Sequence, residues 1–294
     1  MPTYNPDTFD MFMLVGDKKD GLSVKNVMIV EKDINIGNSA LTSLGDPLFI
    51  FERGAFMMTM DWQELLKYEF LFNEIRKIEN PKVLDLGCGN SALRTISYRS
   101  RKRLQYVGVD IDKKVIERQY HGFTLDDTTW YVMNLSGKQL PFEDNEFDIV
   151  IASDVIEHLE KPDDGIMLLK ESIRVGKNMI YMSTPNRTSD SVNEPTVRPP
   201  KFDEKGRLTN GHRYEYSNKE ILTYLKDQPV EIISRYGSLI TQSNLKKEFE
   251  KHPEIKKVMD MSSVRSTSLQ DVICASFFPD SSKDVMYSLK KKHG

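Results

Sequence analysis

Short apolar runs alternate with helical patterns through the middle of the chain. The runs are Val83–Leu86, Tyr106–Asp110, Trp130–Met133, Asp148–Ala152 and Asn178–Ser183, and polar or turn-forming residues separate them. Strands that alternate with helices are typical of right-handed crossovers, which set the strands parallel in one sheet and cover both of its faces with helices. The pattern therefore predicts an α/β fold with a mainly parallel sheet.

Weaker patterns precede this core. Residues 1–60 hold short mixed segments broken by Gly, Asp and Asn, so we expect an irregular N-terminal extension. Asp61–Lys77 places apolar side chains at helical spacing after an Asp that can cap the first turn, which predicts an amphipathic helix. The main domain is therefore expected to run over residues 61–294.

The alternation breaks after Ser183. Residues 184–216 hold four prolines among many polar residues, which favours an insert that serves as a lid or substrate loop. Lys290–His293 at the end of the chain are expected to fray into solvent. Between them we expect a helix, a strand, an insert that is helical in its first part and a last strand, at Asn218–Lys226, Val230–Tyr236, about 241–268 and Asp271–Phe278.

Composition and charge narrow the class of protein. Of the 294 residues, 39% are hydrophobic and 29% charged, as in globular proteins, and the net charge of −3 argues against nucleic acid as a partner. Cys88 and Cys274 are too few for a disulfide framework or a cysteine-rich metal site. No apolar run reaches the roughly 18 residues of a membrane span. We therefore expect a cytoplasmic protein without a membrane contact.

The strongest local motif is K-V-L-D-L-G-C-G-N, an apolar strand that runs into a glycine-rich turn before a helix. Gly87 and Gly89 permit positive φ and a close approach of a ligand to the backbone. Together with Ala92 they also fit a dinucleotide fingerprint, so a nicotinamide cofactor has to be weighed. The glycines alone do not decide whether the ligand is a nicotinamide dinucleotide.

Two acidic residues favour a cationic ligand over a pyrophosphate. Asp85 lies on the strand just before the turn, where its carboxylate would repel a pyrophosphate and attract an amino group. Asp110 ends the next strand, where its carboxylate can accept hydrogen bonds from both hydroxyls of a ribose. An adenosine ligand that carries positive charge and no phosphate satisfies both.

Three runs of this chain resemble the successive motifs of class I S-adenosyl-L-methionine (SAM)-dependent methyltransferases. They are V-L-D-L-G-C-G-N, Y-V-G-V-D-I-D and L-P-F-E-D-N-E-F-D-I-V-I-A-S-D-V-I-E-H-L, within a resemblance that covers about residues 61–236. It implies a Rossmann-like, seven-stranded, mainly parallel sheet whose last two strands form an antiparallel hairpin. It also implies SAM as the cofactor and methyl transfer as the reaction.

The resemblance implies a cofactor site, position by position. Asp110 would bind the ribose, and Ile111 would pack on the adenine. Asn134 would accept a hydrogen bond from the adenine amino group, at a position where related proteins often have an acidic residue. Cys88 is expected to be a small filler of the turn rather than a nucleophile. The full expected set is Asp85, Gly87, Cys88, Gly89, Asp110, Ile111, Asn134, Leu135 and Ser153.

Two histidines are candidates for the base of an O-methylation. His158 follows the fourth strand at the carboxyl edge where open α/β sheets bind ligands, and His212 follows the proline-rich insert. Asp154 and Glu157 lie on the same edge and could orient a substrate. Asp154, Glu157 and His158 form no recognised ligand spacing such as H-E-x-x-H, so we expect no metal.

The expected function is methyl transfer from SAM to a hydroxyl of a small molecule or a sugar or glycan. S-T-P-N-R at Ser183–Arg187 and the insert that follows are similar to methyltransferases of metabolites and glycans. Two alternatives stay open: a nucleic-acid methyltransferase, and a SAM-binding scaffold protein without catalysis. The acceptor atom and the oligomeric state have no signature in the sequence.

Overall fold

The computed structural model describes residues 48–50, 57–59, 71, 74–89, 104–113, 116, 128–187, 211–261 and 277–292. The chain divides into two compact units, one of residues 1–79 and 92–103 and one of residues 80–91 and 104–294. Within its described ranges, no helix is long and apolar enough to cross a membrane.

The described part of the first unit holds a short pair of strands. β1 (Leu48–Ile50) pairs antiparallel with β2 (Met57–Thr59), so the expected irregular extension contains a small hairpin. Residues 71 and 74–76 are helical, in agreement with the end of the predicted amphipathic helix, and Ile75 is fully buried. The first part of that helix, residues 61–70, lies outside the described residues.

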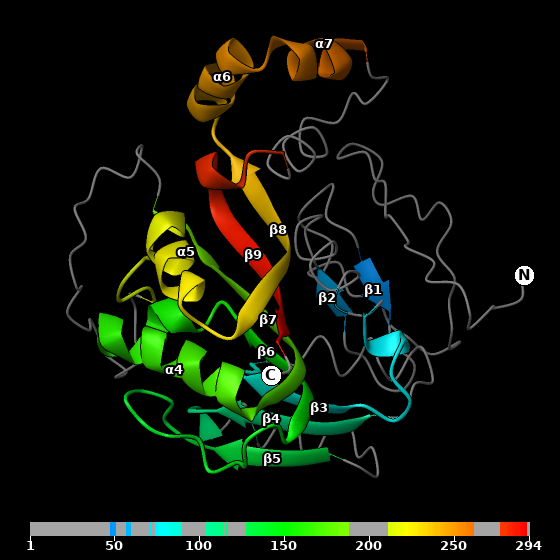
Figure 1. Cartoon of the computed structure of the whole chain (residues 1–294), viewed down its shortest axis with the longest axis vertical. Helices are drawn as coiled ribbons and strands as arrows, with labels where there is room; N and C mark the ends of the chain where they lie inside the picture. Colours follow the sequence, from blue (N-terminus) through cyan, green and yellow to red (C-terminus); the bar gives the residue numbers. More distant parts are fainter. Residues whose placement is uncertain are drawn as a thin grey trace, which may run out of the picture. The chain divides into compact units, whose positions relative to one another are not determined.

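The second unit is built on a seven-stranded sheet in the order β5-β4-β3-β6-β7-β9-β8 (Figure 1). The strands β3 to β7 pair in parallel, whereas β9 is antiparallel to both of its neighbours, as the resemblance implied. Their bounds are β3 Lys82–Leu86, β4 Gln105–Asp110, β5 Thr128–Val132, β6 Phe147–Ser153, β7 Gly176–Pro185, β8 Val230–Ile240 and β9 Ser282–Lys291.

The last strand lies later in the chain than its predicted position. Asp271–Phe278 was the expected strand, but residues 271–276 lie outside the described residues, Pro279–Ser281 form a 3₁₀ turn, and β9 begins at Ser282. Lysines lie at both ends of β9, whereas its centre from Val285 to Leu289 is buried between β7 and β8. The charged ends therefore made this segment look like an exposed tail in the sequence. The prediction of a fraying end was therefore wrong for Lys290 and Lys291.

Helices α4 (Pro162–Val175) and α5 (Asn218–Lys226) contribute to the main core. Figure 1 shows them on the same side of the sheet, and their buried side chains, among them Leu168 and Ile221, pack in one cluster with Leu84 of β3 and Tyr287 of β9. Side chains at alternate positions of the strands supply the sheet side of this cluster. The helix predicted over Asn218–Lys226 is confirmed.

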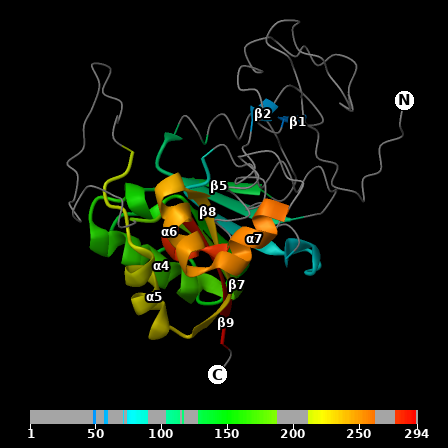
Figure 2. The ribbon, with the colours of Figure 1, turned by 90° about the horizontal axis from the view of Figure 1, so that it is seen from above.

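The insert between β8 and β9 is helical where the structure describes it. It consists of α6 (Gln242–Lys251) and α7 (Pro253–Met261), which meet at an angle in Figure 2. Ile240, Leu245 and Phe278 form a small separate core beneath them. Most of the other expected insert, residues 188–210, lies outside the described residues.

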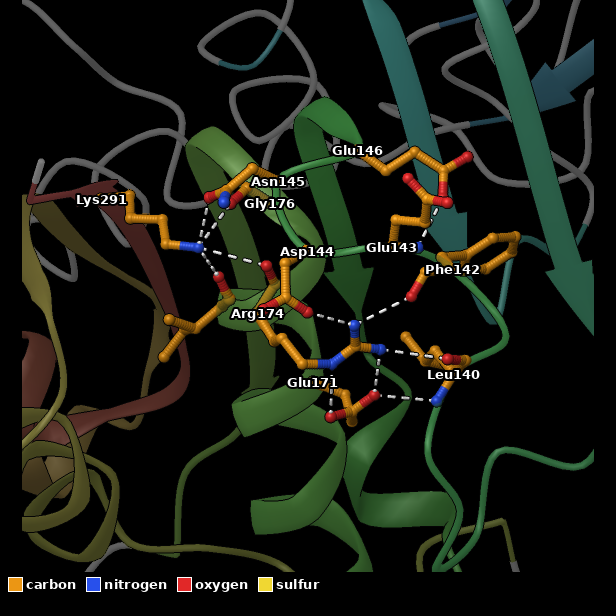
Figure 3. A network of polar contacts seen from close by, with 11 residues as sticks. Leu140, Phe142, Glu143, Asp144, Asn145, Glu146, Glu171, Arg174, Gly176 and Lys291 are labelled. Carbon is orange, nitrogen blue, oxygen red and sulfur yellow. Dashed lines mark hydrogen bonds and ion pairs between the residues drawn. The ribbon is translucent and has the colours of Figure 1, made fainter.

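Arg174 of α4 holds the loop that enters β6. Its guanidinium donates two hydrogen bonds to the buried carboxylate of Glu171, at 2.9 and 2.7 Å, and others to the carbonyls of Leu140 and Phe142 (Figure 3). Lys291 of β9 approaches the same loop and donates to the carbonyls at the C-terminal end of α4. These bonds satisfy carbonyls that a helix end and a loop would otherwise leave without partners.

Candidate functional site

A cleft of about 800 Å³ opens at the carboxyl edge of the parallel strands. Four segments line it: the turn after β3, the end of β4, the segment after β5 and the segment after β6, with one residue from the segment before α5. The lining residues are Gly87, Asp110, Ile111, Met133, Asn134, Leu135, Ser136, Asp154, Val155, His158, Leu159, Glu160, Lys161 and Arg213. In open α/β sheets this edge is where ligands bind.

The glycine turn after β3 forms one wall. Gly87 and Gly89 have φ of +67° and +47°, and a Cβ atom on Gly87 would lie 2.6 Å from the side chain of Val155. Both residues therefore have the backbone freedom that the sequence analysis required. Gly87 lines the cleft, whereas Gly89 and the buried Cys88 support the turn without lining it.

Asp110 ties that turn to the end of β4. Its Oδ2 accepts a hydrogen bond of 2.9 Å from the amide of Gly89, and its Oδ1 accepts one of 2.9 Å from the amide of Asp112. Each carboxylate oxygen keeps a second lone pair for a ligand. Next to it, the side chain of Ile111 is 65% exposed at the cleft, a position suited to the flat face of an apolar ring.

Asp85 lies behind the cleft wall and does not line the cleft. The hydroxyl of Tyr106 donates to its Oδ2 at 2.5 Å. Burial raises the pKa of Asp85 to about 7, the hydrogen bond from Tyr106 opposes the rise, and the charge of Asp110 adds to it. Ser153 at the end of β6 also lies outside the lining, where its Oγ is 2.9 Å from the Oγ of Ser183.

The segment after β5 supplies the opposite wall. Oδ1 of Asn134 accepts a hydrogen bond of 2.9 Å from the amide of Ser136, so one acceptor position of this amide is already used. Leu135 is buried beneath it and contributes its surface to the cleft. Five further lining residues carry no mark in the sequence, because nothing in their spacing distinguishes them: Met133, Ser136, Glu160, Lys161 and Arg213.

The structure brings the two candidate histidines together. Their rings meet edge to face, with centroids 5.2 Å apart. The backbone carbonyl of Glu157 accepts hydrogen bonds from the amides of Arg213 and Tyr214, at 2.6 and 3.1 Å, and so joins the segment after β6 to the one before α5. His158 lines the cleft, whereas His212 is not among the lining residues.

Each histidine uses Nδ1 for a structural bond. Nδ1 of His158 lies 2.5 Å from the carbonyl oxygen of Gly211, and Nδ1 of His212 lies 3.1 Å from Oε1 of Glu215. A carbonyl only accepts, so Nδ1 of His158 carries a proton. Burial lowers the pKa of His158, which favours its neutral ring with the lone pair on Nε2.

Glu157 is fully buried beside the histidines. Its Oε2 accepts a hydrogen bond of 3.1 Å from Thr184, while its Oε1 has no hydrogen-bond partner among the described residues and lies 3.8 Å from Nε2 of His158. Burial, together with the charge of Asp154, raises the pKa of Glu157. Glu157, His158 and His212 each offer one ligand atom within 4.8 Å of the others, a grouping that the sequence spacing did not reveal.

The comparisons with known proteins agree with this geometry. Residues 84–179 match the family described as a methyltransferase domain. A 123-residue stretch is 28% identical to a mitochondrial ubiquinone biosynthesis O-methyltransferase of Schizosaccharomyces pombe, covering 40% of this chain and 43% of that protein. A stretch of 172 residues is 28% identical to a tRNA U34 carboxymethyltransferase of Photobacterium profundum, covering 54% and 51%.

A solved structure of a SAM-dependent methyltransferase from Methanosarcina mazei is similar over 76% of this chain and 98% of that one, with a TM-score of 0.49 and 16% identity. The chain spans about half the length of the curated relatives it matches. Residues 84–179 contain the glycine turn, Asp110 and His158, and so cover the main walls of the cleft. The family match identifies a methyltransferase domain over residues 84–179, and the sheet around it is the one that the resemblance to class I SAM-dependent methyltransferases implied.

Proposed function

We propose that the protein transfers a methyl group from SAM to a hydroxyl of a small molecule, a sugar or a glycan. The observation that supports this most is that Asp110 and His158 line the same cleft. Asp110 offers carboxylate oxygens to a ribose, and His158 presents a ring that can handle the proton of a hydroxyl. One cleft thus has room for the cofactor and for the activation of an acceptor.

The cofactor residues expected from the sequence fit this proposal in two groups. Asp110, Ile111, Asn134 and Leu135 line the cleft and would hold the adenosine part, through its hydroxyls and its ring. Gly87 lines the cleft without a side chain, since a Cβ atom there would collide with Val155 at 2.6 Å, and its bare backbone lets a ligand approach.

The second group of expected cofactor residues does not line the cleft. Cys88, Gly89 and Ser153 would support the methionyl side by packing and hydrogen bonding, without touching the cleft. The buried carboxyl of Asp85 would favour the positively charged amino group of the cofactor through its charge. These assignments predict that substitutions in the first group weaken binding directly.

When bound, SAM supplies the methyl group on a positively charged sulfur. The residues of the chain have to position the acceptor oxygen in line with that methyl and remove the proton of the hydroxyl. His158 can accept this proton at Nε2, because its Nδ1 is held by Gly211. His212 contacts the ring of His158 from behind and acts as a positioning residue.

The names of the relatives leave the acceptor class open. An O-methyltransferase of ubiquinone biosynthesis supports an oxygen acceptor, and a tRNA U34 carboxymethyltransferase supports a nucleic acid. The expectation against nucleic acid, which came from net charge, is therefore not supported by the comparisons. Lys161 and Arg213 place two cationic side chains in the cleft lining, where a phosphate group could contact them.

The test is binding and turnover with the full chain. We expect S-adenosylhomocysteine to bind by titration calorimetry, and we expect transfer of labelled methyl from SAM to phenols or sugars rather than to unmodified tRNA. His158→Ala should lower turnover by about 10²-fold or more, the usual contribution of a positioned base, with little change in the affinity for S-adenosylhomocysteine. His252→Ala, a histidine on the insert, is the matched control.

Three results would contradict parts of the proposal. Near-normal turnover in both His158→Ala and His212→Ala would remove the histidines from the reaction. Transfer to tRNA alone would replace the acceptor class. Binding of S-adenosylhomocysteine without turnover on any acceptor would favour a scaffold protein.

A further inference from the structure

The strongest unexplained feature of the described residues is the oxygen Oε1 of Glu157. It is fully buried and has no hydrogen-bond partner, although its neighbour Oε2 is bonded to Thr184. A buried carboxylate oxygen without a partner is costly, so such groups are usually found with a proton, a cation or a metal ion. Nε2 of His158 lies 3.8 Å from it, and Glu157, His158 and His212 each offer a ligand atom within 4.8 Å of the others.

The two histidines are oriented as metal ligands are. A histidine that binds a metal through one ring nitrogen almost always donates the other N–H to a carbonyl or a carboxylate, which fixes the tautomer. Nδ1 of His158 faces the carbonyl of Gly211, and Nδ1 of His212 faces the carboxylate of Glu215. In both rings this leaves Nε2 as the atom with a lone pair.

In the carboxylate form of Glu157, Oε1 is an acceptor that lies 3.8 Å from Nε2 of His158, which also carries a lone pair. This separation is too long for a hydrogen bond. A cation with bonds of about 2.0 to 2.2 Å to nitrogen and oxygen needs ligand atoms about 3 to 3.5 Å apart, so a small closing movement brings them into range. The side chain of His212 completes the group within 4.8 Å.

We propose that Glu157, His158 and His212 bind a divalent cation of the first transition series or zinc at the wall of the cleft. Two imidazoles and one carboxylate suit these cations better than Mg²⁺ or Ca²⁺, which prefer oxygen ligands. Three protein ligands leave positions open for a substrate oxygen. Asp154 lines the cleft nearby and adds negative charge that favours a cation.

The cation would also explain how the acceptor hydroxyl is activated, and this step rests on the proposed function. A hydroxyl bound to the cation would lose its proton to water more readily, and its oxygen would take the methyl group from the sulfur of SAM, which would leave as S-adenosylhomocysteine. His158 would be a ligand in that case and not the base. Binding of the cation itself does not depend on methyl transfer and is tested separately.

The experiment is a Co²⁺ titration of the chelator-treated full chain without an affinity tag, followed by visible absorption. We expect one equivalent to bind, with the band intensity of a site that contains nitrogen ligands, and Zn²⁺ to displace it while Mg²⁺ does not. His158→Ala and His212→Ala should each weaken Co²⁺ binding at least about 10-fold, the usual effect of losing a ligand or its support. His252→Ala should bind like the wild type.

A second variant leaves every ligand in place. A Cβ atom on Gly211 would lie 3.0 Å from Cε1 of His158, so Gly211→Ala should turn that ring and weaken Co²⁺ binding. Glu157→Gln, which removes the carboxylate ligand, should also weaken Co²⁺ binding, and Gly211→Ala keeps the experiment decisive if that variant fails to fold. Absence of saturable Co²⁺ binding, or equal binding in wild type, His158→Ala and His212→Ala, would overturn the proposal.

The two proposals fail in different ways. Normal binding of S-adenosylhomocysteine and methyl transfer in the presence of a chelator would exclude the cation and leave the proposed function intact. Tight Co²⁺ binding by a chain that transfers no methyl group would support the cation site and exclude the proposed function.

Discussion

The hydroxyl of Tyr106 donates a hydrogen bond of 2.5 Å to Oδ2 of Asp85, across the paired strands β4 and β3. The bond lies two residues before Gly87, where the chain enters the glycine turn. Because burial raises the pKa of Asp85 to about 7, this carboxyl changes its charge close to neutral pH. Its charge state therefore controls the electrostatics behind the cleft wall.

The affinity for S-adenosylhomocysteine should rise with pH. The amino group of the ligand is positive and favours ionised Asp85, so below the pKa of about 7 a proton must leave before tight binding. We expect the affinity to fall by up to about 10-fold for each pH unit below that value, and to level off above it. Titration calorimetry between about pH 5.5 and 8.5 measures this slope.

Two variants test whether Asp85 is the group that causes the pH dependence of binding. Asp85→Asn should flatten the pH profile and weaken binding at high pH. Tyr106→Phe removes a donor that favours the carboxylate, so the step should move to higher pH. A flat profile in the wild type, or an unchanged slope in Asp85→Asn, would exclude Asp85 as the group that titrates.

The two glycines of the turn should respond differently to alanine. For Gly89→Ala no atom of the described residues lies closer than 3.9 Å to the added Cβ, so the positive φ should cost about 1 to 2 kcal/mol of unfolding free energy. Gly87→Ala meets a similar φ and the side chain of Val155 at 2.6 Å, and should cost about 1 to 3 kcal/mol more. Urea unfolding of the two variants measures the difference.

A double-mutant cycle isolates the contact between a Cβ atom at position 87 and the side chain of Val155. Val155→Ala creates space next to Gly87, so the combined variant Gly87→Ala, Val155→Ala should be less destabilised than the sum of the single changes. Additive costs would mean that the turn relaxes away from Val155. S-adenosylhomocysteine binding should be lost in Gly87→Ala even where the protein remains folded.

Asp110→Ala should weaken binding of S-adenosylhomocysteine more than it weakens the fold. Two hydroxyl bonds to a charged acceptor contribute about 1.5 to 3 kcal/mol each, and the lower value for both bonds already corresponds to a loss of about 100-fold in affinity. The change also removes the acceptor for the amides of Gly89 and Asp112.

Its control is Asp227→Ala at the end of α5, outside the cleft lining. The control variant should bind normally in the same calorimetric titration. Asp110→Asn, which keeps one acceptor oxygen, should lie between the alanine variant and the wild type. An affinity within about 3-fold of the wild type in Asp110→Ala, which is less than 1 kcal/mol, would refute a ribose contact at this residue.

Arg174→Leu should strongly destabilise the second unit. It leaves the carboxylate of Glu171 buried without its cation and removes donors from the carbonyls of Leu140 and Phe142. Removal of one partner from such a pair costs about 3 to 5 kcal/mol. Asp144→Ala removes only a 70% exposed partner of Arg174 and should cost about 1 kcal/mol or less.

The pair also predicts an acid dependence of stability. Burial acts to raise the pKa of Glu171, but hydrogen bonds from Arg174 and from the amide of Leu140 outweigh it and lower the pKa. The stabilisation is therefore present above the unfolded-state pKa and is lost as pH falls through the folded-state value. Urea unfolding should show this loss in the wild type and a smaller one in Arg174→Leu, and equal losses would contradict it.

The sequence by itself determined the fold class, the glycine turn and the acids around it. These features depend on local order: alternating apolar runs predict parallel strands, and glycines at the end of a strand predict a tight turn. The same reasoning placed the last strand too early, because lysines at both ends of β9 hide a buried centre. Burial between β7 and β8 is a tertiary property that no local pattern carries.

Only the tertiary structure decided which side chains share a site. His158 and Gly211 are 53 positions apart, and the backbone of Glu157 brings their segments together by accepting the amides of Arg213 and Tyr214. That contact creates the group of Glu157, His158 and His212, whereas the spacing of Asp154, Glu157 and His158 in the sequence had predicted no metal site. Backbone hydrogen bonds between distant segments depend on the path of the chain in space, so residue spacing alone could not reveal them.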